Sequence, residues 1–368
     1  MTKILFLINT LGGGGAEMVL VNLVNNMDRT KFDITVQTMF GGGVNADRLS
    51  SHIRYIEGHD PCPPGIAYIF RMLSAKKLYK HYIGNEHYDV LVAYMHGAPV
   101  KVIEGCPDKS VKKFAFIHNG NPESNSCFRF WSSKKDAFAA YSECTGVVGV
   151  SDTVTHAFES FTGIRHNTHT VYNTNDCSRI WEMSSEFSPE YSTGINLVTV
   201  GRLGSEKGFD RLIDNIVRLR SEGYNLNLTI VGGGSLQKDL SEQITRLNAS
   251  EFIRMTGFKA NPYPYVRNAD MFVCSSHTEG LSTAVTEAVI LGVPCVSTEV
   301  SGAKEILGEN DEYGLVVPNS SDGIYDGIKR LLDNPEMLEH YREKASQRAE
   351  FFATEKTVKM AESLFLSI

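Results

Sequence analysis

The sequence has few of the elements that mark common functional classes. Its seven cysteines are scattered, and none of them form a C-x-x-C pair. This argues against a disulfide framework or a zinc site and predicts a cytoplasmic protein. No apolar run reaches the roughly 18 residues that a membrane-spanning helix needs. The short apolar run at 4–8 is too weakly flanked for a signal peptide and predicts a first buried strand instead.

Two ligand motifs are also missing. There is no Asp-x-Asp in the chain, so the sequence offers no metal-binding element for a diphosphate, and we expect neither a bound metal nor a cofactor. The glycine-rich stretch at 12–15 is not the dinucleotide fingerprint G-x-G-x-x-G, because Met18 stands where the last glycine would be. The second absence disfavours a dehydrogenase.

What is present is a chain of 368 residues, long enough for two domains, with 42% hydrophobic and 21% charged residues. These values are typical of a soluble globular protein. Residues 1–175 carry 17 Lys and Arg against 15 Asp and Glu, whereas residues 176–368 carry 19 against 28. A slightly basic N-terminal half can face a membrane surface or an anionic ligand, or it can lack functional meaning. We expect no nucleic-acid partner.

The first half opens as a doubly wound α/β domain does. The buried strand is followed by glycines and then by apolar residues at helical spacing from Ala16 to Met27. Gly14 and Gly15 let the backbone approach a ligand, and the start of a helix favours an anion. Tight packing of the strand on the helix would need the same glycines, so both interpretations stay open.

Residues 66–82 predict an amphipathic helix with a basic face. Its cations are Arg71, Lys76, Lys77 and Lys80. Such a helix can lie on an anionic membrane surface, but we favour the alternative, a packed surface helix with a solvated basic face.

One histidine is better placed than the others. His118 directly follows the predicted strand Phe114–Ile117. Ligands of doubly wound sheets gather at the carboxyl ends of the strands. His118 is therefore a candidate functional residue, and a purely structural role is the alternative.

A second α/β domain begins with a predicted strand at 196–200, followed by a loop framed by glycines. This loop carries Arg202 and Lys207, one planar fork and one point charge, which together suit a diphosphate. The alternative is two surface cations beside the next helix. Later predicted strands end at Gly232–Gly234 and at Gly257-Phe258.

The segment 277–294 combines two carboxylates with the start of a helix. Apolar spacing predicts a helix from about Ser282 to Leu291, with Ser282 or Thr283 as its cap. Glu279 then lies just before the helix, and Glu287 lies in its first turns. The helix N-terminus suits a phosphate, whereas an ionised carboxylate suits sugar hydroxyls. The arrangement predicts a bound sugar nucleotide, and two ordinary surface glutamates are the alternative.

These patterns divide the chain into four parts. We expect an N-terminal Rossmann-like domain at 1–176, a linker at 177–193 and a second Rossmann-like domain at 194–345. A long helical tail is expected from Asp322 onwards, with a C-terminal helix at 346–368.

Four landmarks, at 12–17, 201–208, 232–234 and 279–287, stand in an order that resembles the retaining glycosyltransferases of family 4, or glycosyl transferases group 1. The stretches VGRLGSEKGFDRLI and HTEGLSTAVTEAVILGVPCV carry most of the similarity, and NTLGGGGAE and VYNTNDCSRI add to it. The resemblance, to members of the bacterial polysaccharide and glycolipid type, implies the GT-B fold. In that fold two Rossmann-like doubly wound domains face each other across a cleft, and the last helix crosses back to the first domain.

The resemblance also implies residue roles. Arg202 and Lys207 would hold the donor diphosphate, Glu279 would face the transferred sugar, Glu287 would bind the ribose, and His118 would lie near the reacting carbon. The other donor contacts that it implies are Gly14, Gly15, Gly233, Gly257, Phe258, Gly280, Leu281, Ser282 and Thr283.

The implied function is transfer of a hexose-type sugar from a nucleotide-diphosphate donor, expected to be a UDP-sugar, to a hydroxyl of a saccharide or a lipid-linked saccharide. Transfer would retain the anomeric configuration and need no metal, and the nucleotide-sugar would be a substrate rather than a cofactor. A lipid-linked acceptor and the basic N-terminal half together suggest a peripheral location on the inner membrane face. A non-catalytic nucleotide-sugar-binding protein, a Rossmann-type dehydrogenase and a GT-B epimerase or phosphorylase remain alternatives.

Overall fold

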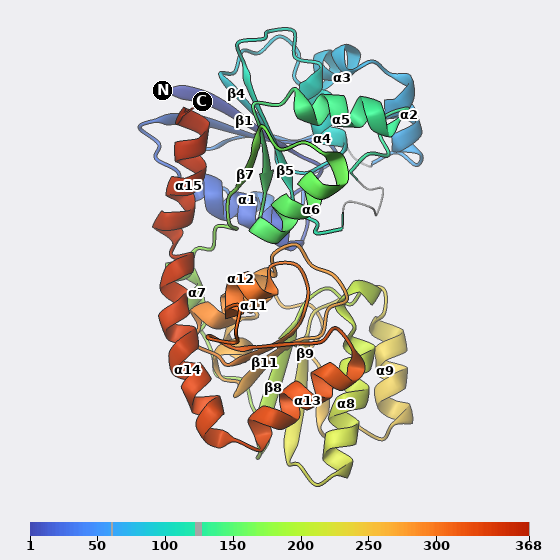
Figure 1. The fold of residues 1–368 in the computed structure, drawn as a ribbon, viewed down its shortest axis with the longest axis vertical. Helices are drawn as coiled ribbons and strands as arrows, with labels where there is room; N and C mark the ends of the chain where they lie inside the picture. The colour runs from blue at the N-terminus through green and yellow to red at the C-terminus, as the bar shows by residue number, and fades with distance from the viewer. Residues whose placement is uncertain (60–61, 122–126, 368) are drawn as a thin grey trace. The chain divides into compact units, whose positions relative to one another are not determined.

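The computed structural model describes residues 1–59, 62–121 and 127–367, and the chain forms two compact units. Unit 1 comprises Met1–Thr174 and Thr354–Ile368, and unit 2 comprises Asn175–Ala353. Each unit contains a parallel β-sheet flanked by helices (Figure 1). The prediction of two Rossmann-like α/β domains is therefore confirmed.

The sheet of unit 1 has the strand order β3-β2-β1-β4-β5-β6-β7, and all of its strand pairs are parallel. Its strands are β1 (Thr2–Ile8), β2 (Phe32–Thr38), β3 (Arg54–Ile56), β4 (Val90–Ala93), β5 (Lys112–Ile117), β6 (Gly146–Gly149) and β7 (Thr168–Thr170). β1 lies inside the sheet between β2 and β4, and its side chains from Ile4 to Ile8 are all buried. The chain order reverses between β1 and β4, and ligands of such sheets bind where this reversal occurs.

The helices of unit 1 are α1 (Gly15–Asn26), α2 (Ile66–Met72), α3 (Ala75–Tyr82), α4 (Ala98–Glu104), α5 (Lys134–Ser142), α6 (Asp152–Thr162) and α15 (Thr354–Ser367). The prediction of one helix over 66–82 is wrong. The backbone is extended at Leu73 and Ser74, and the Ser74 side chain accepts a hydrogen bond from the backbone N–H of Lys77. Ser74 thus starts α3 as an N-cap, and two short helices replace the predicted one.

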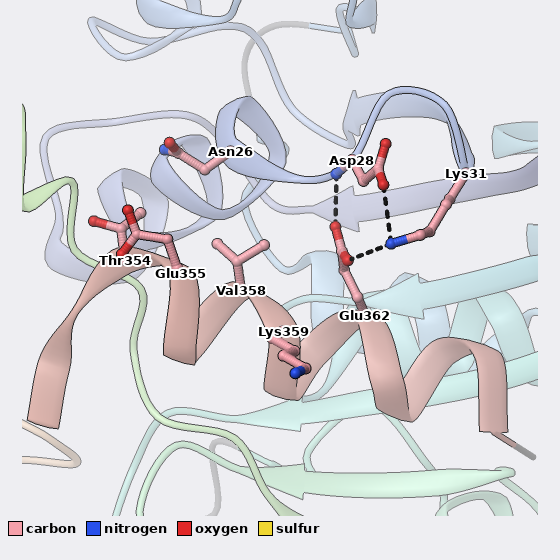
Figure 2. A pocket seen from close by; sticks show the side chains of 8 residues that line it. All are labelled: Asn26, Asp28, Lys31, Thr354, Glu355, Val358, Lys359 and Glu362. Carbon is pink, nitrogen blue, oxygen red and sulfur yellow. Dashed lines mark hydrogen bonds and ion pairs between the residues drawn. The ribbon is translucent and has the colours of Figure 1, made fainter.

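The last helix, α15, packs against the first one. Val358, Ala361 and Phe365 lie in the same buried core as β1, β2, β4, β5 and α1, and the Phe365 ring makes an edge contact with that of Phe6. Figure 2 shows the polar edge of this contact, where Glu362 accepts a 2.6 Å hydrogen bond from the backbone N–H of Asp28 and lies 3.7 Å from the Lys31 ammonium. Three of the residues that line the pocket drawn there, Asp28, Lys31 and Glu362, bond one another, so we interpret it as the seam that fixes α15.

The sheet of unit 2 has the order β10-β9-β8-β11-β12-β13 and is also parallel throughout. Its strands are β8 (Ile195–Val200), β9 (Leu226–Val231), β10 (Ile253–Met255), β11 (Met271–Cys274), β12 (Cys295–Thr298) and β13 (Leu315–Val317). Its helices are α7 (Cys177–Met183), α8 (Phe209–Ser221), α9 (Gln237–Arg246), α10 (Tyr263–Arg267), α11 (Thr283–Ile290), α12 (Ala303–Leu307), α13 (Ser321–Leu332) and α14 (Pro335–Ala349). Here the chain order reverses between β8 and β11, which places the loops after these two strands at the expected ligand edge.

Two segments differ from their sequence-based descriptions. The expected linker at 177–193 begins with α7 and belongs to unit 2. The expected continuous tail from Asp322 is broken at Asn334, whose side chain caps α14 ahead of Pro335, and again at Ala353. Proline at the first helical position and the preceding extended residue explain the first break.

Candidate active site

Most of the predicted donor residues lie at the carboxyl edge of the unit 2 sheet. Arg202 and Lys207 follow β8, and Glu279 follows β11, its neighbour in the sheet. The glycine loops at 232–234 and 257–258 follow β9 and β10. The fold thus brings Arg202 and Glu279, which are 77 positions apart in the sequence, to one edge of one sheet.

Lys207 and Glu279 form an ion pair. The Lys207 ammonium donates a 2.7 Å hydrogen bond to Oε1 of Glu279, and the two side chains are 21% and 13% exposed. Burial acts to lower the pKa of Lys207, but the Glu279 carboxylate outweighs it, so this pKa lies above its usual value. The same Oε1 accepts a 2.6 Å hydrogen bond from the Ser276 hydroxyl. Both hydrogen bonds go to Oε1, so they fix the orientation of the carboxylate and thereby the position of Oε2.

The segment that carries Glu279 is fixed from several sides. Arg211 on α8 donates to the carbonyl oxygens of Ser275 and Ser276, at 2.6 and 2.9 Å. The Thr298 hydroxyl donates to the Ser276 carbonyl at 2.7 Å, and the Ser275 hydroxyl donates to the Lys207 carbonyl at 2.9 Å. These bonds join β8, β11 and β12 at their carboxyl ends, so the Lys207–Glu279 pair has rigid support.

Sequence reasoning missed these supporting residues. Ser276 stands three positions before Glu279, and this Ser-x-x-Glu spacing was the signal that could have found it. Arg211 had no comparable local signal, because its partners are 64 and 65 positions away in the chain.

Arg202 is in a different state from Lys207. Its guanidinium is 77% exposed and donates a 2.7 Å hydrogen bond to Glu206 within the same loop. Arg202 and Lys207, the two residues predicted to bind the diphosphate, thus each form an ion pair with a different carboxylate. An exposed arginine with one local partner can turn towards an anion at little cost.

Glu287 lies on α11, one turn in from its start. The Tyr263 hydroxyl donates a 3.3 Å hydrogen bond to its Oε1. Burial raises the pKa of Glu287 to about 7, and the bond from Tyr263 opposes this only in part. The carboxyl group is therefore ready to ionise near neutral pH when a ligand supplies hydroxyl donors.

The start of α11 has the features expected of an anion site. Ser282, one of the two predicted cap residues, is the N-cap residue of α11, but its side chain makes no capping hydrogen bond. Thr283 begins the helix, and Leu281 and Gly280 before it are buried. The first backbone N–H groups of α11 thus lack a side-chain cap, and the helix dipole favours negative charge there.

The glycine loops of this edge pack backbone against backbone. A Cβ at Gly232 would overlap the carbonyl oxygen of Gly201, which explains the glycine. Gly233 lies beside Phe258. Gly257, which directly precedes Phe258, has a left-handed φ of +71°. The Phe258 ring is 64% exposed, which is unusual for a phenylalanine and leaves its face available at this edge.

His118 lies at the carboxyl end of β5 in unit 1. Its ring contacts those of Tyr94 and Phe116, with centroids 5.1 and 6.3 Å away. Burial, with a smaller contribution from His96, lowers the pKa of His118 to about 3, and a hydrogen bond to the Tyr94 backbone opposes the shift. Among the described residues, Nε2 of His118 is buried and makes no hydrogen bond. A neutral imidazole that bonds the backbone through Nδ1 offers Nε2 as an acceptor.

Gly14 and Gly15 form the start of α1, with Gly14 as its N-cap. A Cβ at Gly14 would overlap the carboxylate of Glu17, which folds back over this first turn. The negative charge expected at a helix start is thus supplied here by the chain itself. Sequence reasoning did not anticipate this, because it treated the helix start as open.

The described residues contain neither a metal-binding cluster nor a membrane-spanning helix. In the part of the chain that the structure describes, no three His, Cys, Asp or Glu side chains are arranged to hold a metal ion. Among the same residues, no helix combines the length and the apolar character that crossing a bilayer requires.

Two family models match the two halves of the chain. Residues 182–348 match the model of glycosyl transferases group 1, and residues 13–179 match that of glycosyltransferase family 4. A Campylobacter jejuni enzyme, the N-acetylgalactosamine-N,N'-diacetylbacillosaminyl-diphospho-undecaprenol 4-alpha-N-acetylgalactosaminyltransferase, is 27% identical over 96% of each chain.

Solved structures show the same fold at low identity. HepE of Anabaena, in complex with UDP and glucose, has a TM-score of 0.79 with 21% identity over 100% of both chains. The sucrose-phosphate synthase of Thermosynechococcus elongatus has a TM-score of 0.80 with 14% identity over 99% of this chain and 98% of that one.

Proposed function

Because the chain belongs to the glycosyl transferases of group 1 and family 4 and has their GT-B fold, we propose that it transfers a hexose-type sugar from a UDP-sugar to a hydroxyl of a saccharide or a lipid-linked saccharide. The observation that carries this proposal is the Lys207–Glu279 pair, supported by three strands beside the uncapped start of α11.

The pair separates two tasks that a sugar nucleotide poses. The diphosphate is an anion, and Lys207, Arg202 and the start of α11 supply positive charge for it. The sugar is neutral and rich in hydroxyls, and Oε2 of Glu279 is an acceptor for them. Glu287 would bind the ribose hydroxyls in its ionised form, and the exposed ring of Phe258 would stack on the base.

The chemistry follows from the departing charge. The bond between the sugar C1 and the diphosphate oxygen breaks, and Lys207 and Arg202 stabilise the oxygen that leaves. The acceptor hydroxyl bonds to C1 on the same face and gives its proton to that phosphate oxygen, so the configuration is retained. His118 takes part as a neutral acceptor through Nε2, which orients a sugar hydroxyl.

Metal independence is part of the proposal. Two cationic side chains and a helix start do the work that a divalent ion does in other transferases. We further propose that no other cofactor is needed, because bond exchange at C1 involves no oxidation or reduction.

The acceptor class rests on the C. jejuni relative, whose name places its acceptor on diphospho-undecaprenol. A lipid-linked acceptor would hold this protein at the inner membrane face from the cytoplasmic side. A free saccharide is the second acceptor class, and the acceptor assay below separates the two.

A binding screen followed by a transfer assay tests the proposal. The thermal midpoint is measured with UDP, GDP, ADP, NAD and UDP-sugars, first with EDTA and then with magnesium. We expect a shift of the midpoint with UDP and UDP-sugars in EDTA, because a ligand of the native state stabilises it by mass action. Lys207→Met should remove the shift. Lys238→Met should keep it, because this variant removes an ion-paired lysine on the exposed surface of α9.

The transfer assay then decides between an enzyme and a binding protein. Release of UDP is measured with free saccharides and with lipid-linked saccharides as acceptors, and the product anomer is determined by NMR. Binding without turnover on either acceptor class would favour the non-catalytic alternative, and a shift with NAD alone would favour a dehydrogenase.

A further inference from the structure

Segment 275–277, which directly follows β11, joins the two partners of the Lys207–Glu279 ion pair. The Ser275 hydroxyl donates a 2.9 Å hydrogen bond to the carbonyl oxygen of Lys207, and the Ser276 hydroxyl donates a 2.6 Å hydrogen bond to Oε1 of Glu279. A shift of this segment would therefore move both partners of the pair. Whatever holds the segment in place thus determines how well the pair is positioned.

All three carbonyl oxygens of the segment are bound by side chains from elsewhere in unit 2. Arg211 on α8 donates from Nε and Nη2 to the Ser275 carbonyl, at 3.0 and 2.6 Å, and from Nη2 to the Ser276 carbonyl at 2.9 Å. The Asn319 side chain donates to the His277 carbonyl at 3.1 Å and accepts a bond from Arg211 at 2.7 Å. Arg211 and Asn319 thus form one network that binds three successive carbonyl groups.

Arg211 also lies against the loop that carries Lys207. Gly208, the next residue of that loop, has a left-handed φ of +59°. A Cβ at Gly208 would overlap the carbonyl oxygen of Ser275 and would lie only 2.8 Å from Nε of Arg211. The glycine therefore leaves the room that the guanidinium occupies, directly beside the residue after Lys207.

The charge of Arg211 is not neutralised as the other charges of this edge are. Lys207 is paired with Glu279, and Arg202 is paired with Glu206. The hydrogen bonds of Arg211 to the described part of the chain all go to uncharged oxygens. The two ion pairs carry no net charge, so Arg211 gives the edge its positive charge.

Arg211 stands at an unfavourable place for a cation. It lies in the first turn of α8, where the helix dipole disfavours positive charge. Burial lowers the pKa of Arg211, and the carboxylate of Asp210 opposes this shift only in part. A guanidinium nevertheless stays protonated in proteins. The cation thus costs stability in the unliganded protein, and a bound anion would recover that cost.

We propose that Arg211, oriented by Asn319, is a positioning residue of the donor site. It holds segment 275–277, which connects Lys207 to Glu279, and it supplies the positive charge that the two ion pairs lack. This charge makes the site favour a diphosphate over a monophosphate and over an uncharged nucleoside. The inference rests on the proposed function, because it places the donor diphosphate at this edge.

Three substitutions separate the charge from the hydrogen bonds. Arg211→Lys keeps a positive charge but replaces the planar fork by one ammonium group, which cannot reproduce all of its bonds. Arg211→Met removes both the charge and the bonds. Asn319→Ala keeps the charge and removes the bond that orients the guanidinium, together with the bond to the His277 carbonyl.

NMR titration with UDP, UMP, uridine and inorganic diphosphate, in EDTA at low salt, measures the role of the charge. Arg211→Met should bind UDP about 30-fold, UMP about tenfold and uridine about twofold more weakly, because the lost attraction grows with the charge of the ligand. Inorganic diphosphate should follow UDP. Arg211→Lys and Asn319→Ala should bind UDP within about threefold of the wild type.

Hydrogen exchange of the backbone amides of residues 275–283 in the unliganded full chain measures the positioning role. We expect about tenfold faster exchange in Arg211→Met and intermediate rates in Arg211→Lys and Asn319→Ala. In the transfer assay Arg211→Lys should lower kcat about tenfold with little change in the donor KM, because the defect lies in the position of Glu279.

The matched control is Arg220→Met on the same helix. Arg220 also bonds an uncharged amide oxygen, that of Asn225 at 2.8 Å. It lies nine residues from Arg211, about 13 Å along the helix axis, which exceeds a Debye length of about 8–10 Å. Arg220→Met has the same net charge as Arg211→Met and should bind UDP within about twofold of the wild type. Thermal midpoints show whether each variant is folded.

Three outcomes would overturn the inference. They are an equal weakening of UDP and uridine in Arg211→Met, unchanged exchange at residues 275–283 in that variant, and an equal loss of UDP affinity in Arg220→Met. A wild type that binds neither UDP nor inorganic diphosphate would refute the proposed function and the role of the charge. The exchange rates need no ligand, so they would still decide whether Arg211 positions the segment.

Discussion

The two carboxyl edges, built on the same topology, differ in their electrostatics. The edge of unit 2 holds charges that are neutralised in pairs, Lys207 by Glu279 and Arg202 by Glu206. At the edge of unit 1, His118 is a neutral ring stacked on aromatics, beside strands of apolar side chains. The difference teaches that the same topology can offer charged groups for an anion at one sheet edge and a neutral hydrogen-bond acceptor at another.

The largest expected effect comes from removing Glu279. We predict that Glu279→Ala lowers kcat/KM by about 10³-fold, because the sugar hydroxyls lose a hydrogen-bond acceptor and Lys207 loses its ion-pair partner. The fold should remain cooperative. Glu206→Ala is the matched control, since it also removes a carboxylate from an ion pair, and it should cost less than about tenfold. Near-normal turnover in Glu279→Ala would show that the charged edge of unit 2 does not bind the sugar through Glu279.

Replacing Lys207 should lower kcat more than replacing Arg202. Lys207→Met should lower kcat by about 10²-fold, and Arg202→Ala by about tenfold, because Arg202 is exposed and contributes only when it leaves Glu206. Single-turnover kinetics with EDTA present would measure both. Equal effects would show that the exposed arginine is as well placed as the supported lysine.

In unit 1, His118→Ala should lower kcat by about 30-fold through loss of a hydrogen-bond acceptor. Since burial holds the pKa of His118 at about 3, the wild-type ring stays neutral at any pH above about 4. The kcat profile between pH 5 and 8 should therefore have the same shape in the wild type and in His118→Asn, which retains an acceptor. A limb that disappears with the imidazole would contradict a neutral role.

Glu287 should link donor binding to pH. Its pKa is raised to about 7, so its carboxylate forms as pH rises through 7. If this carboxylate binds the ribose as proposed, the donor KM should fall over the same range. Glu287→Gln should raise the donor KM by about tenfold and remove this dependence. Calorimetry of UDP binding in buffers of different ionisation enthalpy would detect proton release in the wild type alone.

The same group affects stability with a defined sign. A carboxyl group with a raised pKa in the native state stabilises it fully below its unfolded value near 4.5, and this contribution is lost as pH rises to about 7. Unliganded Glu287→Gln should thus be more stable than the wild type at pH 8, by on the order of 2 kcal/mol, and similar at pH 4.5. Denaturant unfolding at both pH values measures the difference.

The smallest effect should come from Ser276, a positioning residue. Ser276→Ala removes the 2.6 Å bond to Oε1 of Glu279 but leaves the ion pair, so kcat should fall about threefold with little change in the KM for UDP-sugar. Ser276→Thr should recover part of the rate. A change in KM without any in kcat would point to a structural role instead.

Much of the fold could be predicted from local patterns. Buried runs such as 4–8 gave the strands, and the glycines after them gave the ligand edge, because both signals lie within a few residues. The helix breaks at Ser74 and at Asn334-Pro335 also have local signals, because Ser74 and Asn334 are capping residues. We missed them because the apolar periodicity continues across both breaks.

The site could be predicted only in its residue types. A Glu before a helix and a Lys after a strand were visible, but their pairing spans 72 positions and depends on β8 and β11 being neighbours. The support from Arg211 and the raised pKa of Glu287 likewise arise from tertiary packing and burial. Glu17 was visible as a first-turn acid, yet its fold over Gly14 is a side-chain conformation that sequence does not encode.

The position of α15 has a consequence for how the protein is made. The core of unit 1 needs Phe365, yet its sheet is complete by residue 170. At about 5–20 residues per second, a ribosome exposes that sheet for roughly ten to forty seconds before α15 emerges. During this interval the apolar face around Phe6, Phe114 and Phe116 is uncovered. Translation that stops early would therefore leave a sheet without its cover, and the nascent chain should be a client of ribosome-associated chaperones.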